Sequence, residues 1–131
     1  MPIRPVAVGL VLCELVVVEE STRHVTAVNC FSRRVIDGEI GSMPPFYVLA
    51  TVVGGHGTMA ARFVIERLDT LEVSFERQFQ LSFANALDEI RATFRVRANA
   101  IPVHGFYQAT LFVEGEAIAL KRFSVHSKGN K

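Results

Sequence analysis

The segment that most constrains the fold is the apolar run Val6–Val18, in which Glu14 is the single charged residue. Apolar side chains occupy both its even and its odd positions, which is typical of a β-strand covered on both faces. The run is also long, since most strands have about five or six residues. We therefore expect either the central strand of a sandwich, crossing between its sheets, or a strand whose second face a partner subunit covers.

A secretory signal peptide is the other interpretation of this run, because Arg4 precedes it. No small-x-small cleavage site follows the run, and Leu12 precedes Cys13 where a lipoprotein signal needs a small residue. The run is also shorter than the roughly 20 residues of a membrane span. We expect a strand of the mature fold, in a cytoplasmic protein that does not contact a membrane.

Composition predicts one globular domain over residues 1–131, with a frayed polar tail at 127–131. Half of the residues are hydrophobic and ten are Phe, which favours a filled core over disorder. The formal charge of +1 indicates no global field that would draw the protein to nucleic acid or to a membrane.

Two cysteines, Cys13 and Cys30, lie in strand-like apolar segments. Neither belongs to a CxxC motif or has the spacing of Cys/His metal ligands. We expect two buried free thiols, as in a protein of a reducing compartment. A disulfide between neighbouring strands is the alternative, and it depends on a Cα separation that the sequence does not give.

Two segments alternate apolar and polar side chains cleanly, Leu71–Phe83 and Ile90–Ala100. Such alternation predicts strands with one face in the core and one in water. A helix is the rival for the first segment, because four of its apolar residues recur at every fourth position. That helix would leave Val73 and Leu81 off its apolar face, so we expect a strand.

The clearest hairpin joins Phe106–Val113 to Glu116–Val125 through a two-residue Glu-Gly turn. Such a turn fixes the register, which places Tyr107 opposite Arg122. At Arg122 the apolar side chains change from even to odd positions of the strand, and this predicts a bulge or a change of sheet there.

Turns rich in glycine and proline recur about every ten residues and divide the chain into seven to eight strands. This pattern predicts an all-β fold, an antiparallel β-sandwich. At most one short helix is expected, near residues 85–90.

The two ends of the chain carry a resemblance. The turn Pro102-Val103-His104-Gly105-Phe106-Tyr107 leads into the terminal hairpin, and Leu12-Cys13-Glu14 lies in the N-terminal strand. Together they resemble a family of small bacterial β-sandwich proteins of unknown function. The resemblance implies the same sandwich and implies no catalytic residues.

The candidate binding surface is an outward row of three arginines, Arg91, Arg95 and Arg97. Alternate residues of a strand lie about 7 Å apart, close to the phosphate spacing of a nucleic-acid strand. The row is therefore a candidate anion-binding site. A structural role is favoured over it, because Glu72 and Glu76 would neutralise the arginines if the two strands were neighbours. No aromatic residue interleaves with the arginines to stack on bases.

His56 and His104 form a candidate loop site, since both lie in glycine-containing turns. Neither has a second ligand at metal-binding spacing, so no metal is expected. The turn Gly54–Gly57 lacks the Lys-Ser/Thr of a P-loop. No serine lies in a nucleophile elbow and no acidic pair suits acid–base catalysis. We expect no cofactor and no catalytic residue.

These observations favour a non-enzymatic module that has a structural role or binds proteins. The apolar strand and the 50% hydrophobic content exceed what one small core buries, so a homo-oligomer is the first expectation. Binding of anions or nucleic acid by the arginine row is the less favoured alternative. A third hypothesis places an enzyme site near the turns Gly54–Gly57 and Pro102–Gly105, and an absent pocket there would count against it.

Overall fold

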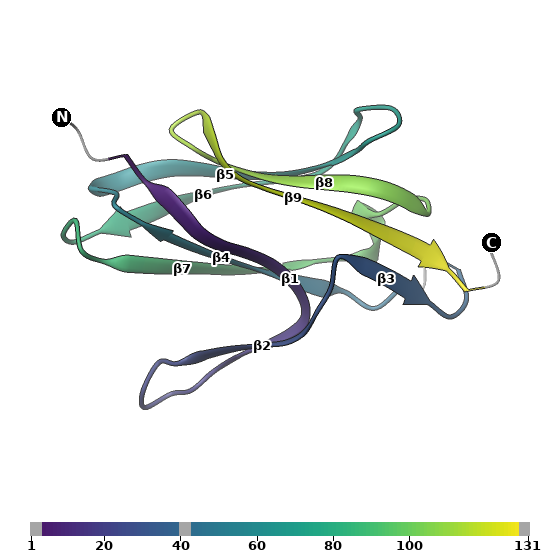
Figure 1. Cartoon of the computed structure of the whole chain (residues 1–131), viewed down its shortest axis with the longest axis horizontal. Helices are drawn as coiled ribbons and strands as arrows, with labels where there is room; N and C mark the ends of the chain where they lie inside the picture. The colour runs from purple at the N-terminus through teal and green to yellow at the C-terminus, as the bar shows by residue number, and fades with distance from the viewer. Residues whose placement is uncertain (1–3, 40–42, 129–131) are drawn as a thin grey trace.

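The computed structural model describes residues 4–39 and 43–128, and these form two stacked β-sheets (Figure 1). One sheet has four strands in the order β2-β1-β4-β7, and the other has five in the order β3-β9-β8-β5-β6. The predicted all-β sandwich is confirmed, with nine strands in the described residues. Their bounds are β1 Val6–Val18, β2 Val25–Cys30, β3 Arg33–Ile36, β4 Phe46–Val53, β5 Gly57–Arg67, β6 Val73–Phe83, β7 Glu89–Val96, β8 Gly105–Val113 and β9 Glu116–Ser127.

The strand pairs are antiparallel with one exception, β3 and β9, which run parallel with Arg33 opposite Ser124. Two residues, Phe31 and Ser32, separate β2 from β3, although the two strands belong to different sheets. The chain therefore crosses from one layer of the sandwich to the other at this point.

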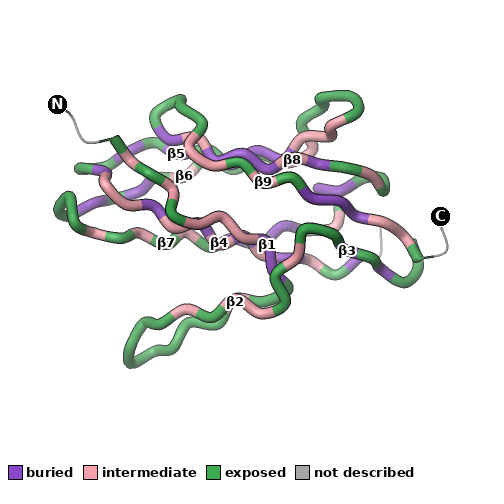
Figure 2. Tube along the Cα trace, in the orientation of Figure 1, coloured by how far each residue is buried: buried purple, intermediate pink, exposed green. Residues whose placement is uncertain are grey.

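The core lies between the two sheets, and β4 shows how alternation builds it. Its side chains at even positions, from Phe46 to Val52, are buried, while those at odd positions are half-buried on the other side. From the facing sheet, Phe63 meets Phe94 of β7 edge-on at 4.8 Å between ring centroids. Figure 2 shows these buried positions as purple segments along the stacked strands.

The β8–β9 hairpin has the predicted Glu114-Gly115 turn but a different register. Val113 pairs with Glu116 as expected, whereas Tyr107 lies opposite Phe123 rather than Arg122. A β-bulge at Ile118 causes the shift, because one extra residue moves every later pair by one. The predicted bulge thus exists, but nearer the turn than Arg122.

The predicted helical segment near 85–90 is a turn, held by the Asp88 carboxylate, which accepts hydrogen bonds from the Ala84 and Asn85 amides. The short helix within the described residues is instead a 3₁₀ turn, η2, at Ala98–Ala100. The prediction of a frayed tail at 127–131 is wrong at Ser127, which belongs to β9 and pairs with β3. Residues 129–131 of that tail lie outside the described residues.

Candidate functional site

The strand β1 changes its partners at Cys13. From Val6 to Cys13 it pairs with β4, and from Cys13 to Val18 it pairs with β2. Its first half therefore belongs to the sandwich, while its second half continues into a two-stranded hairpin. We call the residues Glu14–Asn29 of this hairpin the arm.

The arm leaves the sandwich on the side of the four-stranded sheet that faces away from the five-stranded sheet (Figure 1). Within the described residues, neither of its strands has a second hydrogen-bonding neighbour, so both edges of the arm are open. Apolar side chains on both of its faces are exposed: Leu15 by 47%, Val17 by 46% and Val18 by 43%. Figure 2 shows exposed and half-buried residues along its whole length.

A hairpin of this kind is marginally stable in water without further contacts. Its open edges also present unpaired backbone N–H and C=O groups to any other strand. Soluble proteins blunt such edges with prolines or inward charges, and Thr26–Val28 of β2 has neither. The arm therefore combines open strand edges with exposed apolar side chains.

The outer face of the four-stranded sheet is the second apolar surface. We define it by the outward side chains of β1 and β4, of which Val11 lies opposite Leu49 and Cys13 opposite Tyr47. Val11, Tyr47 and Leu49 are half-buried, whereas Cys13 on the same face is fully buried. The apolar surface of the arm thus adjoins an apolar sheet face at the base of the arm.

The predicted double coverage of Val6–Val18 describes only the middle of the strand. Leu12 and Cys13 are fully buried, but Val6 and Val8 at one end are more than half exposed. The sequence could not place this strand because β1 is a strand of the sandwich up to Cys13 and a strand of the projecting arm after it.

The arginine row lies on β7, at the edge of the four-stranded sheet, beside its apolar outer face. Arg91 lies opposite Thr51 and Arg95 opposite Tyr47, and both side chains are exposed. Arg97 follows the strand and is exposed as well. The structure therefore places the three predicted side chains on one exposed edge.

The glutamates expected to neutralise this row do not lie on a strand that pairs with β7. β6, which carries Glu76, belongs to the other sheet, and Glu76 binds Arg62 at 2.8 Å. Arg91 instead lies 3.6 Å from Glu89 of its own strand. Arg95 forms no ion pair within the part of the chain that the structure describes. The expected cross-strand neutralisation is thus wrong, because consecutive strands here belong to different sheets.

A hollow opens beside the arginine row, where the edges of the two sheets meet. Its lining combines cationic, acidic and neutral polar side chains with the backbone of η2. The residues are Ser74, Phe75, Glu76, Arg95, Arg97, Asn99 and Ala100.

His56 and His104 are exposed, and they lie far apart. His56 precedes the first residue of β5, whereas His104 precedes β8, whose start lies beside the last residues of β5. An 11-residue strand separates the two turns, and it spans roughly 35 Å at about 3.3 Å per residue. The two histidines and their turns therefore cannot form one site, although a hollow lined by Leu68, Asp69, Gly105 and Phe106 adjoins the second turn.

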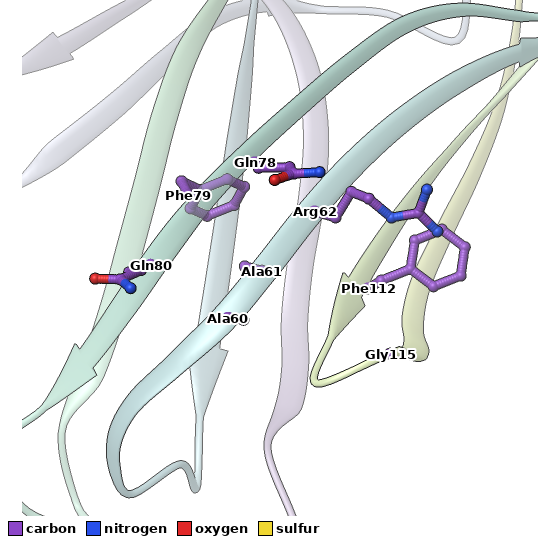
Figure 3. A pocket seen from close by; sticks show the side chains of 8 residues that line it. All are labelled: Ala60, Ala61, Arg62, Gln78, Phe79, Gln80, Phe112 and Gly115. Atoms are coloured by element: carbon purple, nitrogen blue, oxygen red, sulfur yellow. The ribbon is translucent and has the colours of Figure 1, made fainter.

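Another hollow, which the sequence did not indicate, lies on the five-stranded sheet (Figure 3). Its wall is formed by Arg62, whose guanidinium carbon lies 4.5 Å from the ring centroid of Phe112. The ion pair with Glu76 holds the same guanidinium. Both contacts occupy the arginine, so this cation is engaged in packing the sheet surface.

Arg34 is the buried cation that sequence reasoning missed. Only 8% of it is exposed, its guanidinium donates a hydrogen bond to the Pro44 carbonyl at 2.9 Å, and it lies over the rings of Phe31 and Phe46. Burial lowers the pKa of Arg34, and the nearby Glu14 carboxylate opposes that shift. The flanking Phe31 was the available signal, since aromatic rings shield a guanidinium from water. Arg34 fastens the base of the arm to the sandwich.

The cysteines are free thiols, of which Cys13 is buried and Cys30 exposed. They lie directly opposite each other at the base of the arm. Burial, and then the neighbouring Cys30, raise the pKa of the Cys13 thiol. The expectation of two buried thiols is therefore met by Cys13 alone.

The described residues contain neither a candidate metal site nor a helix that could span a membrane. No group of three or more His, Cys, Asp or Glu side chains there could hold a metal ion. No helix in the same residues is long and apolar enough to cross a membrane.

No family model matches the sequence, and no curated protein matches it. Among solved structures, an immunoglobulin-like protein from Pseudomonas aeruginosa aligns over 95% of this chain and 98% of its own, at 10% identity and a TM-score of 0.47. A β-glucosidase from Listeria innocua in complex with isofagomine aligns over 71% of this chain and 15% of its own, at 13% identity and a TM-score of 0.46. An alkylpurine DNA glycosylase from Pseudomonas fluorescens, bound to DNA containing an abasic site analog, aligns over 89% and 30%, at 16% identity and a TM-score of 0.44. The chain thus spans less than a third of either enzyme, and these likenesses carry no argument about function.

Proposed function

We propose that this protein is a non-enzymatic protein-interaction module that self-associates through its arm. The observation that carries the proposal is the arm itself, a two-stranded hairpin with open edges and with Leu15, Val17 and Val18 exposed. A single chain gains nothing from holding these side chains in water, because each buried Leu or Val side chain is worth about 1.5–3 kcal/mol. A second copy presents the same apolar surfaces, so two copies cover them by symmetry.

The test substitutes the arm without removing strand-forming residues. In the variant Leu15→Thr/Val17→Thr, we expect the dissociation constant of the oligomer to rise by about a hundredfold or more. Sedimentation velocity over a series of concentrations up to the high micromolar range measures it. A wild-type chain that stays monomeric throughout that range would refute the proposal.

A matched control changes two equally exposed strand residues on the other sheet. Val35 is 52% exposed on β3 and Leu120 is 56% exposed on β9. The variant Val35→Thr/Leu120→Thr should associate as the wild type does. If this control lost association to the same extent, the loss would come from replacing any exposed apolar residues and not from changing the arm.

Anion or nucleic-acid binding remains the second candidate function, and one observation favours it. Arg95 and Arg97 line a hollow together with the polar side chains of Ser74 and Asn99. The Glu76 carboxylate lines the same hollow and opposes an anion there. We therefore rank this function second and expect the arginines to serve the association of two copies.

A further inference from the structure

We propose that the arm of one copy lies across the outer face of the four-stranded sheet of a second copy, with its acidic tip against the arginine row. This inference rests on the proposed self-association and names where the arm binds. The occupant of the outer face is a second copy of this chain, and charge, reach and apolar continuity support it.

The arm and the arginine row carry opposite charge. The arm contains three glutamates and one arginine, Arg23, and its tip begins with Glu19 and Glu20. The β7 segment and Arg97 hold three arginines against one glutamate, Glu89. The two formal charges are therefore equal and opposite, at two elementary charges each.

Both charge groups are available to a partner. Among the described residues, the Glu20 carboxylate forms no ion pair, and the Glu19 carboxylate accepts a hydrogen bond from the Ser21 hydroxyl and forms no ion pair. On the row, Arg95 and Arg97 are likewise without an ion pair among the described residues. Charges left unpaired within each copy can be matched between copies.

The dimensions of the arm suit the sheet. Going from β1 to β7 across the outer face takes two strand spacings, which is about 10 Å. The arm strand Glu14–Val18 spans about 16 Å at about 3.3 Å per residue. An arm whose base lies over β1 of the other copy is therefore long enough to cross β4 and reach β7.

The surfaces between base and tip are apolar on both partners. The arm offers Leu15, Val17 and Val28, and the sheet offers Val11 and Leu49. An arrangement with a two-fold axis makes both contacts twice, once for each arm. The interface thus has the usual anatomy, with an apolar centre and a charged rim.

Charge reversal tests this arrangement with two variants. One is Glu19→Lys/Glu20→Lys and the other is Arg91→Glu/Arg95→Glu. In each variant alone, the tip and the row carry the same sign, so the dissociation constant should rise at least about tenfold at low salt. In an equimolar mixture every tip meets a row of opposite sign, and heterodimers should form with an affinity near that of the wild type.

The outcomes separate this inference from the proposed function. If both variants associate as the wild type does and mixing has no effect, the arrangement is refuted while self-association stands. If the arginine variant alone is weakened and mixing does not restore it, the acidic tip is not the partner of the row, which also refutes the arrangement. A monomeric wild type refutes both. The control Arg122→Glu/Lys128→Glu applies the same charge change on the other sheet and should associate normally.

Discussion

Gly55 is the residue at which the packing leaves least room. It is buried in the β4–β5 turn, and an added Cβ would lie 2.3 Å from the Phe83 ring. Phe83 is itself buried at the end of β6, so the ring has little space to move. We expect Gly55→Ala to lower the free energy of unfolding by about 1–3 kcal/mol, as other overpacked cores do. Urea denaturation of the dilute protein measures it.

The control for Gly55 is Gly9, the strand glycine of β1. A Cβ added there meets no atom within 4 Å. Gly9→Ala should therefore leave the free energy of unfolding unchanged or slightly higher, since alanine loses less backbone entropy than glycine on folding. A Gly55→Ala variant as stable as Gly9→Ala would contradict this prediction, because it would show that the Phe83 ring moves aside without cost.

Cys13 and Cys30 lie opposite each other on neighbouring strands but form no disulfide. The Phe31 amide donates to the Leu12 carbonyl at 2.9 Å, which makes the two cysteines a non-hydrogen-bonded pair of the antiparallel ladder. Cα atoms of such pairs lie about 4.5 Å apart, within the range of about 4.4–6.8 Å that disulfides accept. Oxidation can therefore lock the base of the arm without moving the backbone.

Glutathione disulfide should oxidise this pair in a pH-dependent way. The exposed Cys30 forms the mixed disulfide, and the Cys13 thiolate then attacks the Cys30 sulfur and releases glutathione as its thiolate. Because the pKa of Cys13 is raised, its thiolate is scarce at pH 7 and more abundant at pH 9. Mass spectrometry should show the glutathione adduct accumulating at pH 7 and the internal disulfide forming faster at pH 9.

Cys13→Ser is the control for this reaction. It removes the resolving thiol, so the adduct on Cys30 should persist at both pH values. A wild-type adduct that persists at pH 9 would contradict the geometry, because it would mean that Cys13 cannot reach the Cys30 sulfur.

Among the elements, the strands with one buried and one solvent-exposed face were the most predictable. Alternation predicted β6 from Phe75 to Phe83 and β7 up to Val96 with the correct core faces. It was wrong at the ends of both segments, because Leu71 and Val73 are exposed and Ala98–Ala100 forms a 3₁₀ turn. Alternation does not say which strands pair, so the sheet order was unknown. The expected contact between Glu76 and the arginine row failed for that reason, because β6 and β7 lie at the edges of different sheets.

The β8–β9 hairpin shows a second limit of sequence patterns. The Glu-Gly turn fixed the pair of Val113 and Glu116, but the bulge at Ile118 changed every later pair. No turn residue marks this bulge in the sequence, and its extra residue, Ile118, is half-buried against the core. The core positions of Tyr107 and Phe123 follow from the fold and not from the turn.

Part of the candidate site was predictable from the sequence and part was not. The sequence identified Arg91, Arg95 and Arg97 as an outward row because they share one phase of a strand. It identified the apolar strand Val6–Val18 but not the point where this strand leaves the sheet. That point depends on where β4 begins to pair, at Tyr47 opposite Cys13, which is a property of a distant segment.

At the scale of the whole molecule, apolar residues lie both in the core and on the surface. The sandwich core takes the facing sides of the sheets, and exposed apolar side chains lie on the arm and also elsewhere, among them Val35, Leu87 and Phe106. Two layers bury one face of each sheet, and they offer no third layer for a projecting hairpin. The fold therefore combines a two-layer sandwich with a projecting arm that, under the proposed function, association stabilises.

This dependence predicts where hydrogen exchange responds to concentration. In dilute protein the backbone amides of Val16–Val18 and Val25–Val28 should exchange quickly, because the hairpin alone is marginal. As concentration rises, association should protect them, since a partner that binds the ordered arm stabilises it by mass action. Amides of β4 and β8, in the middle of their sheets, should exchange slowly at every concentration. In Leu15→Thr/Val17→Thr the arm should remain unprotected when concentrated, whereas arm amides of the wild type that are equally protected at all concentrations would show that the arm is stable on its own.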